Sequence, residues 1–238
     1  MKYDASYVYS NETLIDHYSS FDNLFSKEID IFENVLKKST YKTALDIGCG
    51  TGRITNVLFR LGFDVTGIDL SEKMINAAKI KYPNINFKLI DITTFPFSEK
   101  AFDIIFFAFN GIDFIYPFTK RIQVLEYIFK LLVPGGIFIY SSHNSACILT
   151  KRKSRIKNLL LNTIQLRIFS HYRKNIDITE GTQIICHQNP LSQKRILSRT
   201  GFTDITIYSN FNTLLEIFFR DYWPYYSAIK PKNWAKQN

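Results

Sequence analysis

The sequence predicts an α/β fold in which helices cover both faces of a doubly wound, mostly parallel sheet of seven strands. Short apolar runs alternate with stretches of helical periodicity along most of the chain. The runs lack the strict alternation of a half-exposed strand, which is typical of strands that are buried on both faces. With 238 residues, of which 46% are hydrophobic, the chain is long enough for one sizeable core. We therefore expect a single α/β domain with modest additions.

The predicted elements of this domain follow one another in strand and helix order from Thr43. The expected strands of the main sheet are Thr43–Ile47, Asp64–Asp69, Asn86–Ile90, Phe102–Phe107, Ile137–Ser141, Thr203–Ser209 and Tyr222–Ile229. The expected helices between them are Arg53–Leu61, Ser71–Tyr82, Thr119–Leu132 and Leu191–Thr200. Right-handed crossovers between the parallel strands would place these helices on both faces of the sheet.

Two additions to the domain are expected. Residues 1–40 are interpreted as an N-terminal helical extension or cap, with one helix from about Phe21 to Lys38, and the domain proper spans residues 41–238. Residues 148–190 follow the fifth strand as an insertion. Apolar residues lie on one helical side of its first part, about 148–175, and this pattern predicts a basic amphipathic helix.

The net charge of +9 is concentrated in one segment of the chain. Between Glu126 and Asp177 there is no acidic residue, and the basic residues there are Lys130, Lys151, Arg152, Lys153, Arg155, Lys157, Arg167, Arg173 and Lys174. The basic segment, residues 151–174, has three interpretations. It is a solvated cationic face, a contact for a phosphate-bearing or membrane-associated partner, or an RNA-binding surface.

Other features of the sequence bear on location and on metals. No stretch approaches the roughly 20 apolar residues of a transmembrane helix, and the first residues do not resemble a secretory signal. The three cysteines, Cys49, Cys147 and Cys186, are an odd number without a paired ligand spacing. We therefore expect a cytoplasmic protein with reduced thiols and no metal site, although peripheral membrane contact stays open.

A glycine-rich turn between a strand and a helix is the strongest motif. It reads Ala44-Leu45-Asp46-Ile47-Gly48-Cys49-Gly50-Thr51-Gly52-Arg53. Glycines at such a turn let the backbone approach a ligand closely and present helix N-terminal N–H groups to it. A dinucleotide site requires G-x-G-x-x-G, and Arg53 stands where its third glycine would be. An acid two residues before the first glycine disfavours a pyrophosphate and favours a ligand with cationic groups.

This stretch closely resembles the first motif of class I S-adenosylmethionine-dependent methyltransferases, a family with a Rossmann-like fold. Four further stretches, beginning at Val65, Ile90, Phe102 and Leu131, resemble the later motifs, so the resemblance covers about residues 40–142. It implies S-adenosylmethionine as the cofactor. The residues that the resemblance places at the cofactor are Asp46, Gly48, Cys49, Gly50, Gly52, Asp69, Leu70, Asp91, Ile92 and Phe109.

Within this set the resemblance gives roles to three carboxylates. Asp46 would orient the ammonium group of the cofactor, Asp69 would hold the two ribose hydroxyls, and Asp91 would accept from the adenine amino group. Two of the three have a plainer alternative. Asp69 could only cap the following helix, although Ser71 is the better cap, and Asp91 could be a solvated acid at a strand end.

The acceptor side is expected at the ends of the fourth and fifth strands. The predicted substrate residues are Asn110, His143, Asn144 and Tyr18, and His143 is also the candidate base because histidine titrates near neutral pH. A structural role for His143 is the alternative. Methyltransferases that act on nucleic-acid amino groups usually carry an Asn or Asp, two prolines and an aromatic residue after strand four. This chain has Asn110-Gly111-Ile112-Asp113 there.

The expected function is therefore methyl transfer to oxygen or nitrogen of a small-molecule or glycan-type acceptor, which could carry phosphate. The alternatives are an RNA methyltransferase, a membrane-associated lipid or quinone methyltransferase, and a non-catalytic S-adenosylmethionine-binding subunit. The insertion at residues 148–190 would lie on the acceptor side. The sequence does not identify the acceptor, the methylated atom, the oligomeric state or the role of the basic segment.

Overall fold

The computed structural model describes residues 12–36, 40–97, 102–147, 171–177 and 181–233. Its strands are β1 (Thr43–Ile47), β2 (Asp64–Asp69), β3 (Asn86–Leu89), β4 (Phe102–Phe107), β5 (Leu132–Ser141), β6 (His171–Asp177), β7 (Gly181–His187), β8 (Thr203–Tyr208) and β9 (Tyr225–Ile229). Its α-helices are α2 (Glu12–Ser19), α3 (Ser26–Ile31), α4 (Arg53–Arg60), α5 (Glu72–Lys81), α6 (Phe118–Leu131), α8 (Pro190–Thr200) and α9 (Leu214–Arg220). Short 3-10 turns η2 (Ile92–Thr94) and η3 (Gly111–Phe114) follow β3 and β4, and a π-helical turn, η1 (Phe32–Leu36), follows α3.

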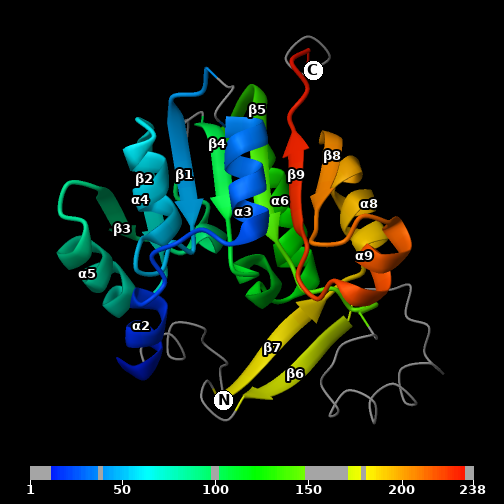
Figure 1. Cartoon of the computed structure of the whole chain (residues 1–238), viewed down its shortest axis with the longest axis horizontal. Coiled ribbons are helices and arrows are strands. Elements are labelled where there is room, and N and C mark those ends of the chain that lie inside the picture. The colour runs from blue at the N-terminus through cyan, green and yellow to red at the C-terminus, as the bar shows by residue number, and fades with distance from the viewer. Residues whose placement is uncertain (1–11, 37–39, 98–101, 148–170, 178–180, 234–238) are drawn as a thin grey trace.

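Seven strands form one sheet in the order β3-β2-β1-β4-β5-β9-β8 (Figure 1). The pairs from β3 to β5 are parallel, whereas β9 runs antiparallel to both β5 and β8. The strand order reverses after β1, where the chain crosses from β3 to β4. This sheet confirms the predicted fold class.

Alternate residues of each central strand enter two separate cores. Ile105 and Phe107 of β4 pack with α6 and α8, while Ile104 and Phe106 pack with α3, α4 and α5. In Figure 1, α3 lies over the near face of the sheet and α6 over the far face. Because both faces are covered, both sets of side chains are apolar, and this produces the continuous apolar runs seen in the sequence.

The N-terminal segment differs from the prediction of one helix from Phe21 to Lys38. The helix α2 ends at Ser19, residues 21–25 are not helical, and α3 begins at Ser26. The break is fixed by the side chain of Glu28, which accepts a hydrogen bond from the backbone N–H of Phe25 at 2.8 Å. In an unbroken helix the Phe25 N–H would instead donate to a backbone carbonyl of the preceding turn.

The region after β5 contains a second correction. The predicted amphipathic helix over residues 148–175 falls partly on residues 148–170, which lie outside the described part of the chain together with the basic residues 151–167. Residues 171–175, however, belong to β6, which pairs with β7 as a separate antiparallel hairpin. Figure 1 shows this hairpin beyond the edge of the sheet at which β1 and β4 end. In the described residues no helix is long and apolar enough to span a bilayer.

A buried ionic network joins η3, α6 and β5. Arg121 Nη1 donates to Asp113 Oδ1 at 2.8 Å, and both side chains are fully buried. The Ser142 hydroxyl donates to the same Oδ1 at 2.6 Å, and the His143 backbone N–H donates to Oδ2 at 2.7 Å. The Arg121 charge and these hydrogen bonds outweigh burial, so the pKa of Asp113 is lowered.

Replacement of Arg121 by Met should destabilise the fold by about 3–5 kcal/mol, because the volume is retained while Asp113 loses its buried countercharge. The measurement is urea unfolding followed by circular dichroism. The matched control is Arg220→Met, which removes an exposed i,i+4 pair with Glu216 and should cost less than about 1 kcal/mol. Equal losses in the two variants would contradict a special role for the buried pair.

Candidate functional site

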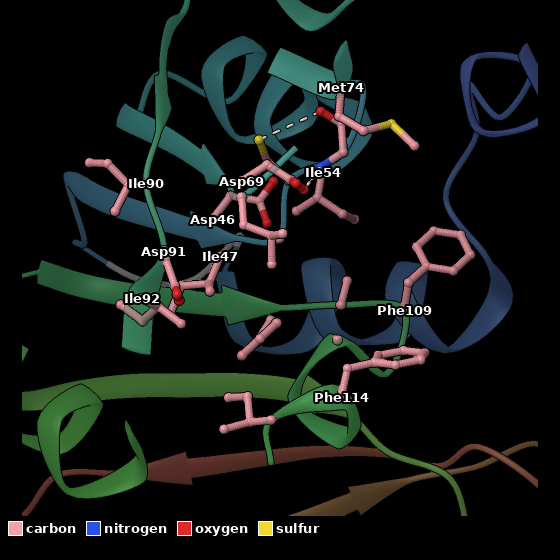
Figure 2. Close-up of a pocket in the computed structure, with 18 of the residues that line it drawn as sticks. Asp46, Ile47, Ile54, Asp69, Met74, Ile90, Asp91, Ile92, Phe109 and Phe114 are labelled. Carbon is pink, nitrogen blue, oxygen red and sulfur yellow. Dashed lines mark hydrogen bonds between the residues drawn. The ribbon is translucent and has the colours of Figure 1, made fainter. Parts of the chain in front are cut away.

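A cavity of about 270 Å³ lies at the edge of the sheet where β1, β2, β3 and β4 end. Ligands bind at this carboxyl edge in open α/β sheets. Figure 2 shows Asp46 and Asp69 on one side of the space, with Phe109 and Phe114 across from them. The cavity brings together these predicted site residues: Tyr18, Asp46, Gly48, Cys49, Gly50, Asp69, Leu70, Asp91, Ile92 and Phe109.

The glycine-rich turn between β1 and α4 forms the floor of the cavity. Gly48, Gly50 and Gly52 have φ of +63°, +53° and +90°, a region that residues with a side chain rarely adopt. A Cβ added to Gly50 would meet no heavy atom within 4 Å, so open space lies above this residue. A Cβ at Gly52 would lie 2.7 Å from Cζ of Phe87. Gly52 therefore fits close packing against β3, and it does not line the cavity.

The carboxylate of Asp69 ties the ends of β1 and β2 together. Its Oδ2 accepts from the backbone N–H of Gly50 at 2.9 Å and its Oδ1 from that of Ser71 at 2.8 Å. Ser71 itself caps α5 by accepting from Met74 N–H, as the sequence indicated. Burial raises the pKa of Asp69, which the backbone hydrogen bonds partly offset. Each carboxylate oxygen has two lone pairs, so Asp69 retains acceptor capacity toward a ligand in the cavity.

Asp46 is more deeply enclosed than Asp69, with a relative exposure of 1%. Its Oδ2 accepts from the Thr55 hydroxyl at 2.6 Å. Burial raises the pKa of Asp46 to about 7, and the nearby Asp69 charge adds to the rise, while Thr55 and Arg53 oppose it. A cationic ligand beside Asp46 would favour the ionised carboxylate and be stabilised by it.

Asp91 stands at the exposed rim of the cavity. Its carboxylate accepts from the backbone N–H and the hydroxyl of Thr93, both at 2.8 Å, and so caps η2. Ile90 and Ile92 place apolar side chains on either side of it (Figure 2). The rim here therefore combines two apolar side chains with a carboxylate acceptor.

An aromatic cluster forms the opposite wall of the cavity. The ring of Phe109 has its centroid 5.7 Å from that of Tyr18, 6.1 Å from Phe21 and 5.5 Å from Phe25. Phe109 has φ of +50°, a conformation that is uncommon for a bulky residue and that the surrounding contacts must hold in place.

Arg53 completes this wall, and the sequence analysis did not assign it to the site. Its guanidinium lies 4.7 Å from the Phe109 ring centroid and 4.9 Å from that of Phe25. Glu28 in α3 accepts from Arg53 through both carboxylate oxygens, at 2.6 and 2.8 Å. A charged residue directly after the last glycine of the turn was the available signal, because that position opens α4 next to the cavity.

Three predicted substrate residues do not line the cavity. The Nδ1 atom of His143 lies 2.9 Å from Asp113 Oδ2, in the buried network behind η3. The side-chain amide of Asn144 donates to the backbone carbonyls of residues 217, 218 and 221. Asn110 is buried and its backbone N–H donates to the Ser141 hydroxyl at 2.8 Å. These contacts tie the three residues to neighbouring segments at the ends of the strands. Their assignment to the substrate stays a prediction.

Comparison with known proteins places the chain in a family. A family model described as a methyltransferase domain matches residues 38–196. A protein of Invertebrate iridescent virus 6 that carries a methyltransferase name is 30% identical over 189 residues, which cover 78% of this chain and 67% of that protein. Demethylmenaquinone methyltransferase of Paenarthrobacter aurescens is 27% identical over 164 residues, 68% of this chain and 62% of that enzyme. A SAM-dependent methyltransferase structure from Methanosarcina mazei has the same fold, with a TM-score of 0.63 at 21% identity over 88% of this chain and 99% of that one.

The Asp46 carboxyl should make the ligand-free protein less stable at alkaline pH. Folding raises its pKa from 3.8 to about 7, so the folded chain binds a proton more tightly than the unfolded chain within this interval. Stability is therefore lost as the pH rises from about 4 to 7. Asp46→Asn keeps an acceptor for Thr55 and removes this loss. It should gain up to about 4 kcal/mol over the parent protein at pH 8, at about 1.4 kcal/mol per pKa unit.

Urea unfolding of the parent protein and of Asp46→Asn at pH 8 and at pH 4.5 measures this difference in stability. The stability that the variant gains over the parent should be smaller at pH 4.5. A variant that is no more stable than the parent at pH 8 would contradict the raised pKa. Glu72→Gln, at an exposed position in the first turn of α5, serves as the control for removal of a carboxylate.

Proposed function

The chain belongs to the S-adenosylmethionine-dependent methyltransferases, and on this basis we propose that it methylates oxygen or nitrogen of a small-molecule or glycan-type acceptor. The fold, the enzymatic activity and the cofactor that the sequence motifs predicted are confirmed. The acceptor class and the roles of individual residues are the proposal. The observation that carries it is the cavity at the carboxyl edge, where the buried Asp46 and the half-buried Asp69 face an aromatic wall.

The residues present fit the cofactor, whose ammonium and sulfonium groups are cationic. In the proposal Asp46 faces the ammonium group, Asp69 accepts from the ribose hydroxyls, and Asp91 accepts from the adenine amino group. Three observations support these roles. The space above Gly50 is open, the oxygens of Asp69 retain lone pairs, and Asp46 is a buried carboxyl that a nearby cation would ionise. Cys49, Leu70 and Ile92 contribute apolar contacts along the same wall.

When bound, the cofactor supplies a methyl group that is activated by a positively charged sulfur. The protein side chains bind, orient and exclude water around it, which aligns the two reactants for direct displacement. The rings of Phe109 and Tyr18 present π-electron faces to a cation, an interaction of about 1 kcal/mol at a partly exposed site. No covalent intermediate with the protein is needed for this chemistry.

A small acceptor is supported by the shape of the site and by the sequence after β4. Tyr18 and Phe109 both line the cavity, with ring centroids 5.7 Å apart, and an aromatic lining of this kind suits a small acceptor. The amino-methylation tetrad of nucleic-acid enzymes is absent at Asn110-Gly111-Ile112-Asp113. A quinone is the second candidate, because one relative of this chain carries the name demethylmenaquinone methyltransferase. The basic segment would then face an anionic membrane, which is also a proposal.

Labelled methyl from S-adenosylmethionine should enter the low-molecular-weight fraction of a cell extract when the protein is added. Incubation with separate metabolite, lipid and RNA fractions identifies the class that receives the label. We expect label in the metabolite fraction, and excess bulk tRNA should leave its incorporation unchanged. Label confined to RNA would overturn the proposal, and label confined to the lipid fraction would favour the quinone candidate.

The affinity for S-adenosylmethionine should depend on pH through Asp46. Only the ionised carboxylate attracts the ammonium group, and a carboxyl with a pKa of about 7 is mostly protonated at pH 6. Between pH 8 and pH 6 the affinity should fall about tenfold relative to that of Asp46→Asn, by proton linkage at one group. The cofactor's own amino group titrates equally in both measurements, so its effect cancels in the ratio of the parent's affinity to that of the variant.

Calorimetry with S-adenosylmethionine and with methylthioadenosine, which lacks the amino-acid part, makes this measurement specific. For methylthioadenosine, the ratio of the affinities of the parent protein and Asp46→Asn should be the same at pH 8 and at pH 6. If both ligands gave the same pH dependence, Asp46 would not be the residue that faces the ammonium group.

A further inference from the structure

The guanidinium of Arg53 is only partly used by the contacts that hold it. Arg53 is the first residue of α4, it lines the cofactor cavity, and its relative exposure is 6%. Its Nη1 donates to the Asn23 carbonyl at 3.1 Å and to Glu28 Oε2, and its Nη2 donates to Glu28 Oε1. The buried Nε–H has no partner among the described residues.

The geometry of these pairs shows which part of the guanidinium remains. The group carries five N–H hydrogens, and Glu28 takes the two at the outer end, one on each Nη. The Asn23 carbonyl takes the other hydrogen of Nη1. The hydrogen on Nε and the second hydrogen on Nη2 remain, and they are parallel donors along one edge of the plane. A carboxylate can accept from such an edge through both of its oxygens.

The neighbours of this edge do not supply an acceptor for it. The rings of Phe25 and Phe109 have their centroids 4.9 and 4.7 Å from Cζ of Arg53, and they orient the guanidinium without accepting from its edge as a carboxylate would. Asp46 Oδ2 accepts from the Thr55 hydroxyl. Because a buried donor without a partner destabilises a fold, such a donor beside a cavity points to a ligand group.

The charge of Arg53 lies near that of Asp46, since it opposes the rise in the pKa of the Asp46 carboxyl. The cavity therefore offers a carboxylate and a guanidinium edge at the two ends of the glycine-rich turn. An α-amino acid carries its ammonium group and its carboxylate on the same carbon, and the two charges have the opposite signs to these. S-adenosylmethionine ends in such a group, and under the proposed function its ammonium faces Asp46.

We propose that the Nε–Nη2 edge of Arg53 binds the carboxylate of the cofactor's amino-acid part, with Glu28 and Asn23 as positioning residues. This inference rests on the proposed function, and it assigns a partner to the anionic end of the cofactor. It also makes the N-terminal segment part of the cofactor site, because α3 supplies Glu28. A bidentate contact of this kind selects ligands that keep the carboxylate.

Decarboxylated S-adenosylmethionine is the probe, because it keeps the sulfonium, the ammonium and the adenosine and lacks the carboxylate. Calorimetry at pH 8, where Asp46 is mostly ionised, compares its affinity with that of S-adenosylmethionine. The parent protein should bind the decarboxylated ligand at least about tenfold more weakly, since two charge-assisted hydrogen bonds are lost.

Arg53→Lys is the first variant, because lysine keeps a positive charge opposite Glu28 and lacks the second edge. Its affinity for S-adenosylmethionine should fall about tenfold, while its affinity for the decarboxylated ligand should change by less than about twofold. Arg60→Lys, at an exposed position in the last turn of α4, is the matched control and should keep the parent's ratio of the two affinities.

A double variant, Glu28→Gln with Arg53→Gln, serves if Arg53→Lys does not fold, because two amide groups can bond to each other in place of the ion pair. It should lose the preference for S-adenosylmethionine over the decarboxylated ligand. The ratio of the two affinities is taken within one protein, so a partial loss of folded protein affects both ligands alike.

The outcomes separate this inference from the proposed function. If neither ligand binds the parent protein, the proposed function fails and the inference fails with it. If the parent binds both ligands equally well, or if Arg53→Lys weakens both by the same factor, the proposed function stands and Arg53 does not bind the carboxylate. A preference that is lost in Arg53→Lys or in the double variant, and kept in Arg60→Lys, supports the assignment.

Discussion

The buried ion pair between Glu28 and Arg53 is the interaction on which the arrangement of the site depends. It joins α3, which precedes the sheet, to the first residue of α4, which follows the glycine-rich turn. The Tyr225 hydroxyl adds β9 to the same carboxylate. An ion pair out of water is stabilising only when its hydrogen bonds are well formed, and the bidentate geometry meets this condition. The aromatic wall of the cofactor cavity then packs around a fixed guanidinium.

The wall of the cavity that lies across from the aromatic rings is acidic. Among the described residues no basic side chain is hydrogen-bonded to the buried Asp46 or the half-buried Asp69, and burial raises the pKa of both. Such a pair is unfavourable in the ligand-free protein and becomes favourable when a cation is bound. Under the proposed function, the site gives up folding stability for affinity toward a cationic ligand, a common relation at functional sites. The charge of Arg53 is paired with Glu28 and lies against the aromatic rings, so it only partly offsets the raised pKa of Asp46.

The network around Asp113 gathers polar groups that follow β5. Asp113 holds Arg121, Ser142 and the backbone and ring of His143, which draws the polar residues at the end of β5 behind η3. The cavity at the sheet edge is lined on this side by the rings of Phe109 and Phe114, with Arg53 beside them and paired to Glu28. Under the proposed function, this side of the site would select an acceptor by excluding water and by packing against its rings.

The sequence by itself determined the sheet, the glycine-rich turn and the acids at the ends of β1, β2 and β3, because each is encoded by neighbours a few residues apart. Strand periodicity and the positive φ of glycines are local properties, and parallel strands bring their carboxyl ends to one edge. Only the tertiary structure decided that His143 pairs with Asp113 and that Glu28 reaches both Arg53 and Tyr225. Glu28 and Tyr225 are 197 residues apart in the chain. Contacts between residues so far apart produce no periodic pattern in the sequence. His143 is a second case, because its partner Asp113 lies 30 residues before it in the chain.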